Sequence, residues 1–92
     1  MTTPSIHRFD VVERMEAFDI IATAIAHGQN AELTLMNETG LQKVSFRITA
    51  TDHNRERHIG TVFGVTADNK SINVVFERNA NDKLEAVQAT IG

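Results

Sequence analysis

The chain has 92 residues, of which 41% are hydrophobic and 23% charged, and its formal net charge is −3. This length supports one folded domain over residues 1–92, and no run approaches the ~20 apolar residues that a membrane-spanning helix needs. The absence of cysteine excludes disulfide bonds, thiolate zinc sites and a thiol nucleophile. With no signal-peptide pattern at the N-terminus, we expect a cytoplasmic protein without membrane attachment, metal or cofactor.

Residues 10–28, DVVERMEAFDIIATAIAHG, have the apolar periodicity of an amphipathic helix. Positions spaced by four and three residues form one apolar stripe, which we expect to pack on the core: Val11, Met15, Phe18, Ala22 and Ile25. Asp10 and Glu13 match a capping box, and Gly28 is a suitable end signal. An earlier start at Thr3-Pro4 is the alternative, because proline is favoured at the first helical position.

After Gly28 the apolar period changes to that of strands. Five strands are predicted, at about 31–37, 41–51, 58–67, 71–79 and 83–91, joined by polar turns. The apolar positions expected to face one interior are Leu33, Leu35, Val44, Phe46, Ile48, Ala50, Ile59, Phe63, Val65, Ile72, Val74 and Phe76. Gly60 and Gly64 interrupt the third strand, which predicts a bulge, a sharp bend or a close backbone approach there. Among the five phenylalanines, Phe9 alone is out of phase with apolar neighbours.

One helix followed by five short antiparallel strands has few compact arrangements. A five-stranded meander with a glycine-bent middle strand tends to curl into a small barrel, with the helix on one open side. The predicted fold is therefore α+β and mostly β: an N-terminal amphipathic helix on a small SH3-like or Sm-like barrel. An open sheet with the helix across one face is the alternative.

The segment FDIIATAIAHGQNAELTLMNETG, a helix followed by a strand and a turn into an alternating strand, resembles two families. One is the WYL-type ligand-sensing domain of bacterial regulators, and the other is the Rof-type family of small Rho-binding inhibitors. The likeness covers most of the chain in element order and involves no diagnostic motif. The chain has no tryptophan or tyrosine, so the motif that names WYL domains is missing. The resemblance implies a helix on a small barrel and a regulatory role, and no functional residue is transferred.

Charged and titratable residues gather in 49–60, TATDHNRERHIG, which the flanking strands predict to be a hairpin tip. A metal site is disfavoured because the two histidines match no zinc spacing and the neighbouring arginines would repel a cation. A catalytic site is disfavoured because nothing in the sequence brings a nucleophile to either histidine. A solvated tip is the favoured interpretation. The alternative is an anion-binding edge formed by Lys43, Arg47, His53, Arg55, Arg57 and His58.

The negative charge of the chain is concentrated in residues 10–28, which carry four carboxylates and one arginine, while the remainder is neutral. Nucleic acid or nucleotide binding is disfavoured by this charge, since duplex binders usually carry a basic stripe. A row of helix residues could instead dock a basic protein partner, although such a row is more often the wetted side of a helix. This candidate face consists of Glu13, Glu16, Asp19 and Ile20.

We therefore expect a small non-enzymatic interaction module, a regulator or inhibitor that binds a protein partner or assembles with itself. The expected contact surfaces are the helix and an open sheet edge. The alternative function is a barrel that binds a phosphate-bearing ligand or RNA through the basic strand and the hairpin tip.

Overall fold

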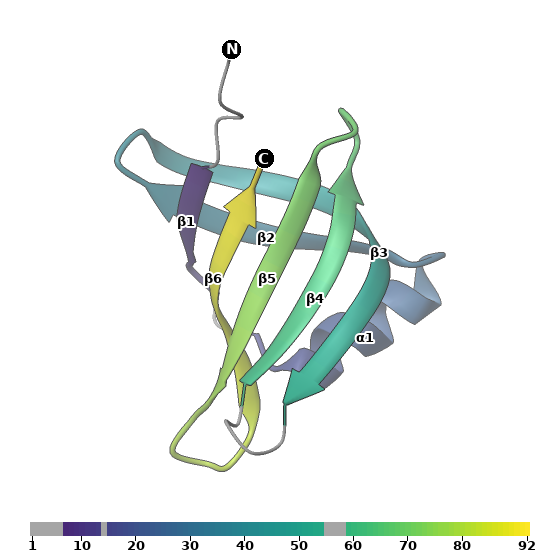
Figure 1. The fold of residues 1–92 in the computed structure, drawn as a ribbon, viewed down its shortest axis with the longest axis vertical. Coiled ribbons are helices and arrows are strands. Elements are labelled where there is room, and N and C mark those ends of the chain that lie inside the picture. Colours follow the sequence, from purple (N-terminus) through teal and green to yellow (C-terminus); the bar gives the residue numbers. More distant parts are fainter. Residues whose placement is uncertain (1–6, 14, 55–58) are drawn as a thin grey trace.

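The computed structural model describes residues 7–13, 15–54 and 59–92, with six strands and one helix. The elements are β1 (His7–Val11), α1 (Ala17–Ala26), β2 (Asn30–Asn37), β3 (Gly40–Asn54), β4 (Ile59–Thr66), β5 (Ser71–Arg78) and β6 (Leu84–Ile91). The strands form a closed antiparallel barrel in sequence order, and β1 closes it by pairing with both β2 and β6 (Figure 1). The mostly β class and the small barrel are thus confirmed, and the open-sheet alternative is wrong.

The first described element is a strand, so the prediction of a helix that starts at Asp10 and precedes only five strands is wrong. Phe9 and Val11 point into the barrel and expose 7% and 4% of their surface, while Arg8 and Asp10 are exposed. This alternation is the strand period of two. Phe9, which looked out of phase in a helix, is a core residue of β1. The alternative start at Thr3-Pro4 lies outside the described residues.

The helix is shorter than predicted, and it is rotated relative to the predicted stripe. Its inner face includes Ile20 and Ala24, which expose 2% and 1% of their surface. Phe18 and Ile25, predicted to face the core, expose 78% and 66%. Successive helix residues are about 100° apart, and the part of the predicted stripe that lies within α1, Phe18, Ala22 and Ile25, points outward, whereas Val11 and Met15 before the helix pack on the core. Gly28, the predicted end signal, takes a left-handed conformation (φ +66°) just after the helix.

The five strands that follow the helix lie within three residues of their predicted bounds. Their core is the expected one in β2, β5 and the first part of β3. The predicted inward residues that expose 3% or less of their surface are Leu33, Leu35, Phe46, Ile72, Val74 and Phe76. The strict alternation of these strands sets the side that each residue occupies.

β4 presents the opposite face to the one predicted. Val62 and Gly64 are buried, whereas Phe63 and Val65 are half-buried on the outer side. On the inward face, a Cβ on Gly64 would lie 2.6 Å from the backbone oxygen of Arg47. Only glycine permits so close an approach. The side chain of Ile59 lies outside the described residues.

The predicted irregularity lies opposite Gly64, in β3. The register between β3 and β4 shifts between Ile48 and Ala50. An inserted residue moves every later side chain to the other face. Ala50 is therefore exposed and pairs with Phe63, so the prediction that it points inward is wrong.

α1 covers the side of the barrel that two strands leave open. Beyond Arg47, β3 continues past the end of its pairing with β2, and the first half of β6 precedes its pairing with β1. The segment before α1 is bound to β6 where Ala86 N donates to Met15 O at 2.8 Å, and Ile48 N donates to Gln29 O at 2.8 Å after α1. The helix thus lies across this opening (Figure 1).

Candidate functional site

The outer face of α1 is apolar, which is unusual for a helix face that meets water. Phe18, Ala22 and Ile25 follow one another at helical spacing, and with Ala26 they form what we call the α1 outer face. Asp19 is the single charged residue within the sequence of α1, AFDIIATAIA. Since the inner face is also apolar, α1 is hydrophobic almost all round, and such helices are normally buried. The α1 outer face therefore has the composition of a covered surface.

Beside Phe18, an open hollow of about 510 Å³ lies between the start of α1 and the start of β6. Its lining, which is mostly apolar, consists of Glu16, Ala17, Phe18, Lys83 and Leu84. We call it the α1–β6 groove. It extends the α1 outer face toward the barrel.

A smaller apolar pocket of about 210 Å³ adjoins the groove, with which it shares Ala17 and Leu84. It is also lined by Val62 and Phe76 from the core and by His53 from β3. The volume suffices for an aromatic ring, because a cavity of roughly 150 Å³ elsewhere holds benzene. Gly60 also lines this pocket, and a Cβ there would lie 3.3 Å from the Leu84 side chain.

Carboxylates lie at the N-terminal end of the α1 outer face. Asp19 is exposed next to Phe18, and Glu16 lines the groove. The Glu13 carboxylate accepts a hydrogen bond of 2.7 Å from the Thr34 hydroxyl, which fixes it at the end of β1. Lys83 Nζ lies 3.9 Å from Glu16 Oε2, and an exposed pair of this length contributes little energy. Among the described residues, acidic charge predominates at this end.

The predicted partner-binding row is only partly exposed. Glu13 lies before the helix rather than on it, and Glu16 occupies the N-cap position. Ile20 is 2% exposed and packs in the core, so its placement on an outward face is wrong. Phe18 and Ile25 were predicted as core residues but lie on the surface. The available signal was the pair Ile20 and Ile21, which makes the helix apolar on more than one side.

The three predicted anion-binding residues that the structure describes, Lys43, Arg47 and His53, do not converge along β3. Lys43 and Arg47 are exposed before the register shift, and Arg47 lines a hollow of about 300 Å³ with Asn30, Ser45 and Asn69. His53 lies beyond the shift, roughly 20 Å farther along the strand at about 3.3 Å per residue. It lines the apolar pocket instead. Arg55, Arg57 and His58 lie outside the described residues.

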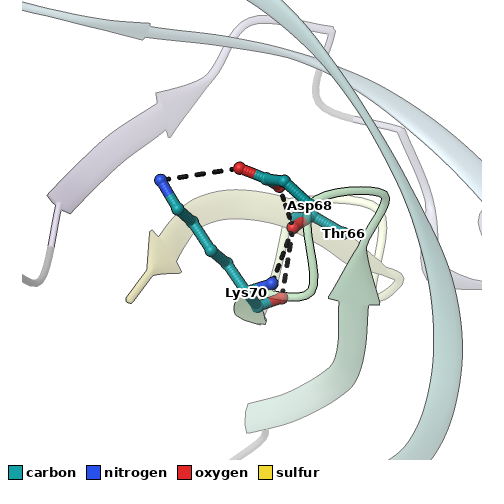
Figure 2. Close-up of polar contacts among 3 residues, drawn as sticks. All are labelled: Thr66, Asp68 and Lys70. Carbon is teal, nitrogen blue, oxygen red and sulfur yellow. Dashed lines mark hydrogen bonds and ion pairs between the residues drawn. The ribbon is translucent and has the colours of Figure 1, made fainter.

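Lys70, a second cation near Lys43, forms an ion pair within the β4–β5 turn. Lys70 lines one hollow with Lys43, but its Nζ lies 3.5 Å from Asp68 Oδ2 (Figure 2). The Thr66 hydroxyl donates to Asp68 Oδ1 at 2.6 Å and accepts a hydrogen bond from Lys70 N at 3.0 Å. The bond from Thr66 lowers the pKa of the Asp68 carboxyl. The charge of Lys70 is therefore balanced within the β4–β5 turn.

Within the described residues, no group of three or more histidine, aspartate or glutamate side chains is placed to hold a metal ion. The described part of the chain also contains no helix long and apolar enough to cross a bilayer.

Comparison of the chain with protein-family models, with curated proteins and with solved structures found no significant match in any of the three. The resemblance to WYL-type and Rof-type proteins therefore stays a prediction. The strand before the helix also departs from the N-terminal helix that this resemblance implied.

Proposed function

We propose that this protein is a small non-enzymatic interaction module, which regulates a partner protein by binding it through the α1 outer face and the α1–β6 groove. The observation that carries the proposal is the exposure of Phe18, 78% of whose surface meets solvent beside an apolar groove. Aromatic side chains next to pockets are typical anchors of protein interfaces.

The energy available at this surface supports binding. Burying one large apolar side chain contributes about 1.5–3 kcal/mol, and two such side chains, Phe18 and Ile25, lie on one face. Part of this gain is offset by the entropy lost on association. Docking through a free strand edge receives less support, because α1 covers the opening between β3 and β6 in the described part of the barrel.

The proposal is tested by capturing partners from the native host on three immobilised forms: the unmodified protein, Phe18→Asp and Leu41→Asp. Leu41, at the start of β3, exposes 66% of its surface and serves as a matched control. Mass spectrometry is expected to find a stoichiometric protein that Phe18→Asp loses and Leu41→Asp retains. Retention by Phe18→Asp contradicts the proposal, and loss with Leu41→Asp alone would move the docking surface to the β2–β3 hairpin.

A second candidate function is the binding of a phosphate-bearing ligand or RNA, which the exposed guanidinium of Arg47 in a surface hollow favours. The hollow offers a guanidinium with neighbouring amide and hydroxyl groups, which suits a phosphate. The double variant Lys43→Glu and Arg47→Glu should abolish salt-sensitive binding of fluorescent RNA or ATP if this function holds. Arg8→Glu, an exposed change on β1, is the control. Unchanged binding by the double variant would exclude this site.

A further inference from the structure

We infer that the segment that docks on the α1 outer face is a basic amphipathic helix of another protein, and not a second copy of this chain. The inference rests on the proposed function and names the chemistry of its partner. It combines the shape of α1 with the sign and the position of the charges around it.

The shape of the α1 outer face fits a helix. Phe18 and Ile25 lie two turns apart on an exposed ridge, with Ala22 between them and Ala26 beside the second. Small side chains between large ones let a second helix approach and place its own apolar side chains between them. An amphipathic helix in an apolar groove is a common recognition mode, with anchors at the spacing seen here.

The charge of the surface selects the partner. Asp19 and Glu16 lie at the Phe18 end, and Glu13, which precedes the helix in the chain, accepts a hydrogen bond from Thr34 in β2. The described cation at this end is Lys83, which makes a long contact with Glu16, and Asp19 forms no ion pair with any described residue. Lysine or arginine on the partner, at the end that meets Phe18, would complement these carboxylates.

The same charges oppose a second copy. If two α1 helices packed in parallel, Asp19 would lie beside Asp19 of the other copy. If they packed antiparallel, Asp19 would meet the C-terminal end of the other helix. That end carries the negative pole of the helix dipole, and its last turn contains no basic residue. A second copy therefore matches the shape of the surface but not its charge.

The test uses two labelled 18-residue helical peptides with an identical leucine and alanine stripe. All polar positions are lysine in one peptide and glutamate in the other, and binding to the full chain is followed by fluorescence anisotropy at low and at physiological salt. The lysine peptide is expected to bind about fivefold or more tightly than the glutamate peptide, and the difference should shrink with salt. Phe18→Asp should abolish binding of both.

Charge position is tested with Asp19→Lys, which should weaken binding of the lysine peptide about fivefold. Glu38→Lys, an exposed change of the same net charge in the β2–β3 turn, should leave binding unchanged. Circular dichroism verifies that each variant is folded. Equal weakening by both variants would mean that net charge alone attracts the peptide, which overturns the inference.

Three other outcomes overturn it: equal binding of the two peptides, no binding of either, or a dimer in light scattering that Phe18→Asp dissociates. The last would assign the surface to a second copy. The proposed function is judged separately, since it fails if Phe18→Asp keeps its captured native partner. If Phe18→Asp loses that partner but Asp19→Lys has no effect, only the inference about charge fails.

Discussion

Gly64 and Gly60 lie on the same inward face of β4, but the space around them differs. A Cβ on Gly64 would be 2.6 Å from a backbone oxygen and 2.8 Å from the ring of Phe46. A Cβ on Gly60 would be 3.3 Å from the end of a flexible leucine side chain. A backbone atom cannot move aside as the end of a side chain can. A larger residue is therefore tolerated less well at position 64 than at position 60.

Gly64→Ala should lower the free energy of unfolding by about 1–3 kcal/mol, the usual cost of overpacking. Gly60→Ala should cost clearly less, because Leu84 can adjust its rotamer. Urea denaturation followed by circular dichroism measures both. Equal losses would show that the contact with Arg47 does not limit the bend.

Asp68 and Thr66 predict a local dependence of stability on pH. The hydrogen bond from Thr66 lowers the folded-state pKa of Asp68 below its unfolded value, so this bond stabilises the fold above the unfolded pKa and is lost as pH falls through the folded one. The difference in urea midpoint between the protein and Asp68→Asn should therefore be present at pH 7 and disappear in acid, as the pH falls below the unfolded value and through the lowered folded pKa. In Thr66→Val, the carboxyl pKa followed by NMR should rise. A midpoint difference that persists in acid would contradict this account.

At the scale of elements, the existence of α1 could be predicted from the sequence, but the face that it buries could not. The helix itself was predictable, because a run of ten residues with nine apolar or small side chains and one aspartate is rich in good helix formers. The face it buries was not, since a helix with apolar residues on both sides has no preferred side in the sequence alone. The acidic residues beside it were correctly expected near the surface, whereas Phe18 was not.

Some strands could be predicted from the sequence and others could not, for a similar reason. β2 and β5 were predictable because large apolar residues recur at every second position, Leu33 and Leu35 in β2 and Ile72, Val74 and Phe76 in β5. β1 was hidden, since Val11 also continues the helical stripe through Met15 and Phe18. β4 was assigned the wrong face because two of its inward positions are glycines, which leave Val62 as the main apolar signal on that side.

Ile20→Ala and Ile25→Ala remove the same atoms from opposite faces of α1 and test the observed rotation. Ile20→Ala should cost about 2–5 kcal/mol, as is usual for a buried isoleucine, and Ile25→Ala should stay within about 0.5 kcal/mol. Thermal and urea unfolding give both values. The reverse order would restore the helix orientation predicted from the sequence.

For the whole molecule, the weakest join of the barrel lies between β1 and β2. These strands pair through Asp10↔Met36 and Val11↔Leu35, whereas β1 and β6 pair through four residue pairs. The connection between the two weakly joined strands is also the segment that contains α1. The barrel therefore depends on the packing of the helix where its ladder of hydrogen bonds is shortest.

Amide hydrogen exchange should be faster at the short pairing between β1 and β2 than elsewhere in the barrel. The amides of Val11 and Val12, the latter bonded to Thr34 O at 3.0 Å, should exchange faster than those at the centre of β5. NMR-detected exchange under native conditions measures the ratio. Uniform protection across both regions would mean that the barrel opens only as one unit.

Because ten residues of α1 complete the core with one face and present the candidate surface with the other, occupancy of that surface is coupled to folding. Any molecule that binds the native helix and not the unfolded chain adds to stability, by about 2.7 kcal/mol at a hundred times its dissociation constant. The melting temperature of the isolated protein can therefore be used to screen for its ligand. A molecule that binds this surface raises the melting temperature, and Phe18→Asp removes the rise.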